Sequence, residues 1–432
     1  MSGSLVMKPG PERTRRLLDA LGAPDRSIPC IVQVAGTNGK GSTAAMLESI
    51  LRAAGRRTAL FISPPLDHEG QSLLLDGRPV GLRRMRRWLG KVDAAAESGG
   101  AAAESDPPTA FERLAAAAVL AAAEARAGVL ILEAGLGGAM DATSAVARTD
   151  LAVITSIALD HRQWLGPTLE DIAREKAGII RGGVPVVTTA QEAALEVIRR
   201  EARRRGAPVL SLGREFDVGG IEVSLSGTRF TLLQEGEDPW PLACRLLGAH
   251  QAVNAAAAAA AARVLGVDRR AVEQGLAAAR WPGRCELARR RPPVLLDGAH
   301  NPAGMAALRR AVDLLFPGRE LVLVCGMLAD KDVDGAAAAW RGRCRLVLAV
   351  APPNPRALPA GDLAAAFRRA GAGPVEEAAS WQEGLARGLA EVEARPGAVL
   401  CACGSLYLVG PARRWLRRRQ GGDPPAVGGA PA

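Results

Sequence analysis

The sequence predicts an α/β protein in which mostly parallel sheets are covered by helices. From residue 28 onward, short β-branched runs alternate with segments rich in Ala, Leu and Arg at helical spacing. This alternation is typical of parallel strands joined by helical crossovers. A composition break near residue 290, with consecutive arginines and prolines, separates two series of strands. We therefore expect a larger domain over residues 1–290, a smaller one over 291–419 and a disordered tail over 420–432.

The clearest strands lie on both sides of this break. They are Ile31–Ala35, Val129–Glu133, Leu151–Ile157 and Val184–Thr188, then Val294–Leu296, Leu321–Cys325, Leu346–Val350 and Val399–Cys403. Residues 216–233 alternate polar and apolar side chains, which predicts an antiparallel ribbon forming a side sheet. The alanine-rich stretches at 94–103 and 255–262 predict packed helices, because alanine is the best helix former.

The bulk composition predicts a soluble protein of the cytoplasm. The chain begins with a charged segment and contains no run of about 18 uncharged apolar residues, so we expect neither a signal peptide nor a membrane span. Its 7 cysteines are scattered without paired spacing, which favours a reducing compartment. The net charge of +10 fits anionic small substrates. With only 3% aromatic residues, we do not expect a nucleic-acid partner.

A glycine-rich loop follows the first strand. Residues 36–43 read GTNGKGST and lead into an Ala/Leu-rich segment, giving the strand, loop and helix order of a phosphate-binding site. Gly36, Gly39 and Gly41 permit close backbone approach, and Lys40 can neutralise phosphate charge. The spacing differs from the common GxxxxGK[ST] pattern. An ordinary glycine turn is the alternative, which this context disfavours.

Two further strands are followed by side chains that can bind a metal. Glu133 ends the strand Val129–Glu133, and Asp160 and His161 come shortly after Leu151–Ile157. We expect them at the ligand-binding edge of the sheet, at the ends of adjacent strands. A carboxylate and an imidazole beside a phosphate loop can hold Mg²⁺, although this ion prefers oxygen ligands.

Lys176 lies on a predicted amphipathic helix. Thr168 and Asp171 have the spacing of a capping box, and the apolar residues that follow share a helix face with Lys176. We therefore expect this lysine to point inward. An uncharged inward amine can react with carbon dioxide to form a carbamate, which would be an oxygen ligand. The alternative is a lysine that extends to solvent, and the residues alone leave both open.

Polar clusters also interrupt apolar runs in the second half of the chain. Residues 250–254 read HQAVN and residues 281–284 read WPGR, and each could be a simple turn or cap. Asp297 and His300 follow the first strand of the second domain. Side chains in that position commonly reach a ligand.

Taken together, these motifs resemble the folylpolyglutamate/dihydrofolate synthase family. In order along the chain, the matching blocks read AGTNGKGST, EAGLGG-x-x-DAT, ITSIALDH, WLGPTLEDIAREKAGII, HQAVNA, WPGR, LLDGAHNP, GMLADKD and CGSLYLVG. The resemblance covers roughly residues 30–410. It implies a Mur-ligase-like P-loop ATPase domain with a side sheet, followed by a smaller Rossmann-like domain. It also implies ATP-dependent ligation of L-glutamate to dihydropteroate or a reduced folate.

The resemblance implies a role for each site residue. The expected ATP contacts are Gly36, Thr37, Asn38, Gly39, Lys40, Gly41, Ser42, Thr43, Asn254, Arg284 and Asp297, and we add His300 from its position. The expected ligands of Mg²⁺, as two ions, are Ser63, Glu133, His161 and a carbamylated Lys176. The expected pterin or folate contacts are Thr109, Phe111, Glu112, Met140, Asp141 and Ala142. Lys40, Lys176 and His161 are the expected catalytic residues.

The acceptor side departs from the family pattern. Pro65 replaces a histidine, residues 70–72 read Gly-Gln-Ser in place of Asn-Glu-Arg, Ala139 replaces an arginine and Ser144 an asparagine. One alternative is therefore a Mur-type ligase for a non-folate acceptor, although only 35 residues precede the loop and leave no room for its usual extra domain. Another is a degenerate nucleotide-binding homologue, against which Glu133, His161 and Lys176 argue. We expect a monomer.

Overall fold

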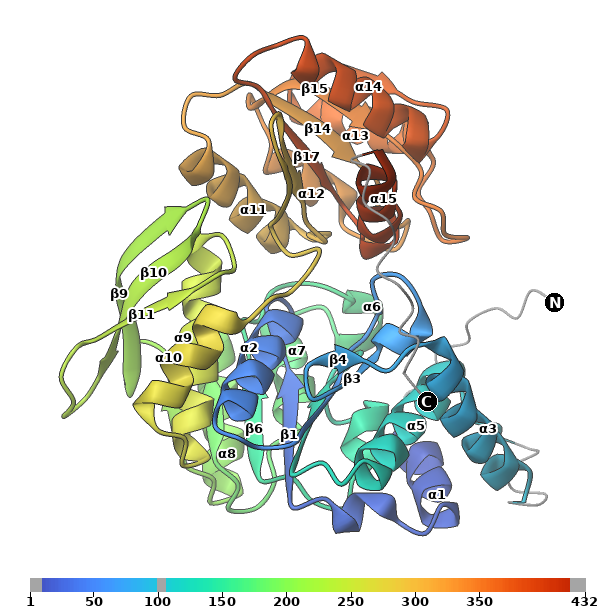
Figure 1. Cartoon of the computed structure of the whole chain (residues 1–432), viewed down its shortest axis with the longest axis vertical. Coiled ribbons are helices and arrows are strands. Elements are labelled where there is room, and N and C mark those ends of the chain that lie inside the picture. The colour runs from blue at the N-terminus through green and yellow to red at the C-terminus, as the bar shows by residue number, and fades with distance from the viewer. Residues whose placement is uncertain (1–9, 99–105, 420–432) are drawn as a thin grey trace, which may run out of the picture. The chain divides into compact units, whose positions relative to one another are not determined.

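The computed structural model describes residues 10–98 and 106–419, which fall into two compact units (Figure 1). The first unit runs up to Gly220 and includes Phe230–Ala243 and Val253–Ala279. The second unit comprises Ile221–Arg229, Cys244–Ala252 and the residues from Arg280 onward. The predicted tail at 420–432 and the end of the alanine-rich stretch at 94–103 lie outside the described residues. The domain boundary near residue 290 stays a prediction.

The first unit is built on an eight-stranded sheet in the order β4-β3-β2-β5-β1-β6-β7-β8. Its strands are β1 (Cys30–Ala35), β2 (Thr58–Phe61), β3 (Leu73–Leu75), β4 (Arg78–Pro79), β5 (Val129–Glu133), β6 (Leu151–Ile154), β7 (Val186–Thr188) and β8 (Val209–Ser211). The strands from β2 to β8 in this order run parallel, and β3 and β4 are antiparallel at one edge. The predicted α/β class and mostly parallel sheet are confirmed.

Two predicted strands are shorter than expected, and the one predicted at Val184–Thr188 begins only at Val186. The strand predicted at Leu151–Ile157 ends at Ile154. After it the backbone leaves the sheet, because the carbonyl of Ser156 accepts a hydrogen bond from the Thr37 amide at 2.8 Å. The polar residues after Ile154 thus bind the glycine loop and do not continue the sheet.

The part of the chain before β12 (Glu286–Arg290) also forms helices. They are α1 (Glu12–Ala20), η1 (Pro24–Ser27), α2 (Lys40–Ala53), η2 (Glu69–Gln71), α3 (Leu82–Glu97), α5 (Ala110–Glu124), η3 (Ala142–Ala145), α6 (Arg162–Leu165), α7 (Leu169–Ala177), α8 (Glu192–Arg204), α9 (Ala249–Val264) and α10 (Arg269–Ala278). The alanines at 255–262 are all fully buried in α9, which confirms the predicted packed helix. Small residues also let α2 and α10 approach closely, since a Cβ on Gly275 would lie 2.3 Å from the Cα of Ile50.

The side sheet has three strands in the order β11-β10-β9, namely β9 (Phe216–Ser224), β10 (Gly227–Gln234) and β11 (Trp240–Cys244). A short turn joins β9 to β10, as expected for an antiparallel hairpin. The second unit contains a six-stranded sheet in the order β12-β13-β17-β14-β15-β16. Only β12 is antiparallel to its neighbour.

The second unit alternates strands and helices along most of its length. Its elements are β12 (Glu286–Arg290), β13 (Pro293–Leu296), α11 (Pro302–Leu315), β14 (Leu321–Cys325), α12 (Val333–Ala338), β15 (Cys344–Ala349), α13 (Ala360–Ala370), β16 (Val375–Glu377), α14 (Trp381–Glu393), β17 (Val399–Cys403) and α15 (Leu406–Arg419). Trp340, Phe316 and Phe367 fill its core. Within the described part of the chain, every helix is too short or too polar to cross a lipid bilayer.

Candidate functional site

Four neighbouring parallel strands bring candidate residues to one edge of the large sheet. The sheet order β2-β5-β1-β6 places Ser63, Glu133, the glycine loop and His161 after the carboxyl ends of these strands. Because β1 pairs with both β5 and β6, it lies between them. The expectation that Glu133 and His161 follow adjacent strands is therefore wrong, and the two residues flank the glycine loop from opposite sides. Sequence order does not reveal that β6 joins the sheet on the side of β1 opposite to β5.

At two positions of the glycine loop, the backbone conformation and the close neighbours accommodate only glycine. Gly36 has φ +145°, and a Cβ there would lie 1.9 Å from the Oγ1 of Thr155. Gly39 has φ +90°, and a Cβ there would lie 2.3 Å from the Oδ1 of Asn254. Asn254, a predicted ATP contact, thus packs directly against the loop. The other contacts predicted within the loop, Thr37, Asn38, Gly41 and Ser42, lie between Gly36 and the first turn of α2.

The loop opens the helix α2 at Lys40, so its backbone amides lie at the positive end of a helix dipole. The Oγ1 of Thr43 in the first turn is buried and has no hydrogen-bond partner among the described residues. A buried polar atom without a partner is uncommon and points to a ligand or ion. A hydroxyl oxygen beside a phosphate loop suits Mg²⁺.

Two lysine amines meet at the start of this loop. The Nζ of Lys40 donates to the carbonyl oxygen of Gly36 at 3.0 Å, and the Nζ of Lys176 donates to the same oxygen at 2.8 Å. Lys176 is only 4% exposed, which confirms the prediction that it points inward. Burial, followed by the charge of Lys40, lowers the pKa of Lys176 to about 7. A large fraction of this amine is therefore uncharged near neutral pH.

The helix that carries Lys176 forms as its sequence predicts. The Oγ1 of Thr168 accepts a hydrogen bond from the Asp171 amide at 3.1 Å, and the Asp171 carboxylate accepts one from the Thr168 amide at 3.3 Å. This reciprocal capping box begins α7. Ile172 and Ala173 are fully buried, and they anchor the face from which Lys176 extends.

Glu133 and His161 differ in exposure. Glu133 is only 5% exposed, whereas the His161 side chain is 29% exposed. His161 has φ +53° just before α6, and its Nε2 lies 3.9 Å from the carboxylate of Asp160. Within residues 10–98 and 106–419, no three His, Cys, Asp or Glu side chains form a metal cluster. Two of the predicted ligands, Ser63 and a carbamylated Lys176, are not His, Cys, Asp or Glu, so the predicted set is not a cluster of that kind.

The predicted acceptor residues on α5 combine capping with packing. The Thr109 hydroxyl and the Glu112 carboxylate form the capping box of the helix. Glu112 also makes a buried ion pair with Arg13, whose Nη2 lies 2.7 Å from Oε1. Phe111 packs on the loop after β5, because a Cβ on Gly135 would lie 2.6 Å from the Phe111 ring. The structure therefore brings Phe111 beside the loop that carries the other predicted acceptor residues.

That loop is held together from within by Asp141. Its carboxylate accepts hydrogen bonds from the amide of Leu136 at 2.8 Å and from the hydroxyl of Thr143 at 2.6 Å. Asp141 is 3% exposed, and burial raises the pKa of its carboxyl group. Ala142 is also buried, whereas the Met140 side chain is 41% exposed. Among the predicted residues of this loop, Met140 thus has the exposed side chain.

The residues that depart from the family pattern make local contacts. The Ser144 hydroxyl donates to the carbonyl of Gly138 at 2.5 Å. Ala139 packs against Gly178, where an added Cβ would lie 2.3 Å from its own. Gly70 lies so close to Gly81 that a Cβ would be 2.4 Å from the Gly81 carbonyl carbon. These atypical positions are therefore part of the packing of the predicted acceptor side.

In the second unit, the predicted ATP contacts gather after the carboxyl end of β13. The Asp297 carboxylate accepts hydrogen bonds from the amide of Cys285 at 2.6 Å and of Ala299 at 2.7 Å. Arg284 lies next to Gly298, where a Cβ would be 2.4 Å from its Nη1. The Nδ1 of His300 is 2.8 Å from the carbonyl oxygen of Gly298. These contacts bring Arg284, Asp297 and His300 together within that unit.

Sequence reasoning missed three residues that shape the site. Arg13 pairs with Glu112, Thr155 packs against Gly36, and Glu175 accepts hydrogen bonds from the amides of Gly138 and Met140. Arg13 carries no signal in the sequence, whereas Thr155 lies in the matching block ITSIALDH. Glu175 has a weak one, since an acidic residue in the last turn of a helix opposes the helix dipole.

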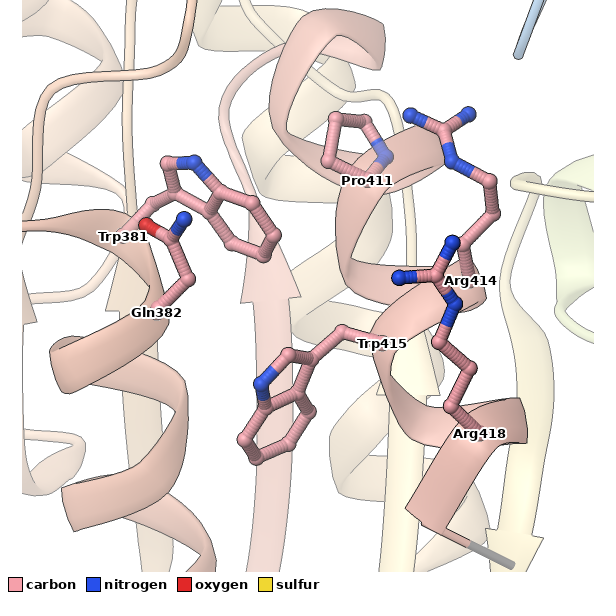
Figure 2. A pocket seen from close by; sticks show the side chains of 6 residues that line it. All are labelled: Trp381, Gln382, Pro411, Arg414, Trp415 and Arg418. Carbon is pink, nitrogen blue, oxygen red and sulfur yellow. The ribbon is translucent and has the colours of Figure 1, made fainter. Parts of the chain in front are cut away.

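Two cavities lie in the second unit and contain none of the predicted residues. One, of about 320 Å³, is lined by residues of α14 and α15, namely Trp381, Gln382, Pro411, Arg414, Trp415 and Arg418 (Figure 2). The other, of about 550 Å³, lies near the turn between β12 and β13 and is lined in part by Arg290, Arg291 and Arg319. Neither overlaps the candidate site.

Comparison with known proteins supports one family. Residues 82–262 match the Mur ligase middle domain, and residues 283–406 match the glutamate ligase domain of Mur ligases. Dihydrofolate synthase/folylpolyglutamate synthase of Bacillus subtilis is 34% identical over 95% of this chain and 96% of its own length. A probable bifunctional folylpolyglutamate synthase/dihydropteroate synthase of Halobacterium salinarum is 39% identical over 95% of this chain, which spans only 50% of that protein.

Solved structures agree with the sequence matches. Folylpolyglutamate synthase of Mycobacterium tuberculosis, complexed with ADP and AMPPCP, has a TM-score of 0.89 at 33% identity and covers 95% of this chain and 96% of that one. E. coli FolC in complex with DHPP and ADP has a TM-score of 0.85 at 30% identity, covering 97% and 95%. A bifunctional synthase with Mn, AMPPNP and L-glutamate bound has a TM-score of 0.83 at 30% identity, covering 96% and 95%. The chain belongs to the folylpolyglutamate synthase/dihydrofolate synthase family of Mur ligases.

Proposed function

We propose that this chain joins L-glutamate to the carboxylate of a pterin or folate acceptor, using ATP. The γ-phosphate of ATP passes to the acceptor carboxylate, which gives an acyl phosphate and ADP. The amino group of glutamate then attacks the acyl carbon and forms the amide, with release of phosphate and a proton. Activation is needed because a free carboxylate is too stable to react with an amine.

The pair of lysine amines at the glycine loop carries this proposal. Lys40 and Lys176 both donate to the Gly36 carbonyl, where the loop amides would face the phosphates of ATP. The positive charge of Lys40, held there in advance, would stabilise the phosphoryl group during its transfer. The reaction requires no covalent enzyme nucleophile, which fits a site composed of cations and metal ligands.

We assign the metal site to Ser63, Glu133, His161 and Lys176. The burial of Glu133 and the unpaired Thr43 hydroxyl support an ion beside the loop. We further propose two Mg²⁺ ions and a carbamate on Lys176, because carbon dioxide reacts with the uncharged amine and the lowered pKa favours that form. The carbamate would add the oxygen ligands that Mg²⁺ prefers. When bound, Mg²⁺ would offset the charge of the ATP phosphates.

We assign the remaining contacts by unit. The glycine loop and Asn254 in the first unit, and Arg284, Asp297 and His300 in the second, would contact the nucleotide. Thr109, Phe111, Glu112, Met140, Asp141 and Ala142 would form the acceptor side. The packing of Phe111 on the loop after β5 supports this grouping. All 7 cysteines are free thiols, which supports a reducing compartment, and we propose a monomer acting in the cytoplasm.

A ligase for a non-folate carboxylate is the second candidate, favoured by the atypical Pro65, Ala139 and residues 70–72. One assay separates the two. ADP release is measured with L-glutamate and either dihydropteroate, tetrahydrofolate or no acceptor, and the products are weighed by mass spectrometry. The folate assignment predicts glutamate-dependent ADP release with at least one folate acceptor and a product heavier by one glutamyl residue. ADP release at the same rate with and without either folate acceptor would contradict the folate assignment.

A further inference from the structure

We propose that Glu175 is a positioning residue for the acceptor loop, defined as residues 136–141 between β5 and η3. Its Oε1 accepts hydrogen bonds from the backbone amides of Gly138 at 3.2 Å and of Met140 at 2.9 Å. The backbone carbonyl of Glu175 accepts a third hydrogen bond, from the amide of Ala139 at 2.9 Å. One residue of α7 therefore fixes three consecutive amides of this loop.

The two glycines of the acceptor loop make this contact possible. A Cβ on Gly137 would lie 2.7 Å from the Oε1 of Glu175, at φ +71°. A Cβ on Gly138 would lie 2.8 Å from the Glu175 carbonyl oxygen and 2.9 Å from that of Lys176. The loop therefore lies directly on the last turn of α7, without a side chain between them.

The position of Glu175 is unfavourable for the helix itself. Glu175 is in the last turn of α7, where the negative end of the helix dipole disfavours an anion. Arg174 and Lys176 are basic residues in the same turn, where the helix dipole favours positive charge. The loop amides offset this cost, because hydrogen bonds to a carboxylate are stronger than those between neutral groups. The acceptor loop thus explains why an acidic residue occurs there.

The same turn of α7 contacts the phosphate loop. Lys176, the next residue, donates to the Gly36 carbonyl at 2.8 Å. Adjacent residues therefore hold the acceptor loop and the phosphate loop in a fixed relation. This inference rests on the proposed function, in which the carboxylate of the acceptor must meet the γ-phosphate. A misplacement of about 1 Å between reacting groups can cost ~100-fold in rate.

The kinetic test uses Glu175→Ala and Glu175→Gln, with Glu170→Gln as the control on the exposed first turn of the same helix. Glu175→Ala should lower kcat/KM for the acceptor by about tenfold or more, because charge-assisted hydrogen bonds to the loop are lost. The kcat/KM of Glu175→Gln for the acceptor should lie between those of the wild type and Glu175→Ala, because the glutamine amide oxygen still accepts hydrogen bonds. The KM for ATP should change by less than about twofold in all three variants. An equal loss of ATP affinity, or an unchanged acceptor kcat/KM, would overturn the positioning role.

A second measurement does not depend on catalysis. Hydrogen exchange of the full-length chain without substrates reports the protection of the amides at 136–141. We expect exchange of the Gly138 and Met140 amides, which lose the carboxylate, to be about tenfold faster in Glu175→Ala and unchanged in Glu170→Gln. If the wild-type chain turns over no folate acceptor, the proposed function fails, whereas faster exchange still supports the role of Glu175. Unchanged exchange at these amides overturns the inference whatever the activity.

Discussion

Lys40 and Lys176 share one hydrogen-bond acceptor, the backbone carbonyl oxygen of Gly36, at 3.0 and 2.8 Å. One of these residues opens helix α2, and the other lies in the last turn of α7. Burial and the neighbouring positive charge lower the pKa of Lys176 to about 7. A large fraction of the Lys176 amine is therefore uncharged near neutral pH, and several predictions depend on this.

The first prediction concerns pH and stability. The pKa of Lys176 is about 7 in the folded chain against 10.5 ordinarily, so the unfolded chain binds more protons between these values. The contribution of Lys176 to the free energy of unfolding should therefore rise with pH across this window, by up to about 1.4 kcal/mol per pH unit. This contribution is fully present at pH values above the ordinary pKa of 10.5. It is lost as the pH falls to about 7, the pKa of Lys176 in the folded chain.

Urea unfolding of the wild-type chain and of Lys176→Met, in buffer free of carbon dioxide, measures this effect. The free energy of unfolding of the wild type should rise more steeply with pH than that of the variant. Lys91→Met, which removes an exposed lysine, should keep the wild-type slope. Identical slopes for the wild type and Lys176→Met would show that Lys176 has an ordinary pKa.

The second prediction concerns the carbamate on Lys176. Activity of the wild-type chain should fall when carbon dioxide is removed and should return on addition of bicarbonate. Lys176→Ala should lose about 100-fold or more in kcat, as is typical when a group that stabilises the transition state is removed. Short carboxylic acids should restore part of this loss by placing a carboxylate where the carbamate would be. Absence of both effects would leave an unmodified lysine as the functional group.

The third prediction concerns Lys40. Lys40→Ala should remain folded and lose about 100-fold or more in ADP formation, because the phosphoryl group loses a positive partner. The same change removes a charge that lowers the pKa of Lys176, so that pKa should move up towards its ordinary value. Turnover and circular dichroism check the first effect, and the pH dependence of stability checks the second. Near-normal ligation by a folded Lys40→Ala would refute the assignment of the loop.

The fourth prediction separates backbone strain from contact at Gly39. Gly39→Ala and Gly55→Ala both force alanine to a positive φ, of +90° and +77°. Each should therefore cost about 1–2 kcal/mol of stability. Only the Gly39 variant also meets the Asn254 amide, because nothing lies within 4 Å of a Cβ on Gly55. We expect Gly39→Ala alone to raise the KM for ATP by about tenfold or more. Equal KM values in the two variants would contradict a role of this contact in nucleotide binding.

The fifth prediction tests the buried ion pair of Arg13 and Glu112. Glu112→Ala should cost about 3–5 kcal/mol of stability, because it leaves the Arg13 charge buried with fewer partners. The double variant Arg13→Met with Glu112→Leu should regain much of that stability. If Glu112 also contacts the acceptor, the double variant will regain its fold and still show a raised acceptor KM. Denaturant unfolding and steady-state kinetics distinguish these two roles of Glu112.

The sequence by itself determined the fold class and the local elements. The strands, the side ribbon, the capping box at Thr168 and Asp171 and the inward face of Lys176 each appear as a pattern of residues close together in the chain. Short-range patterns specify such features because helix and strand periodicities repeat within a few residues. The family motifs added the expectation of ATP-dependent ligation.

Only the tertiary structure decided which of these elements meet. It placed β1 between β5 and β6, brought Lys176 to the carbonyl of Gly36 across 140 residues, and set Glu175 against the acceptor loop. These contacts depend on strand order and on close backbone approach, which no local pattern encodes. The lowered pKa of Lys176 has the same origin, because burial and the nearby Lys40 charge exist only after the chain has folded.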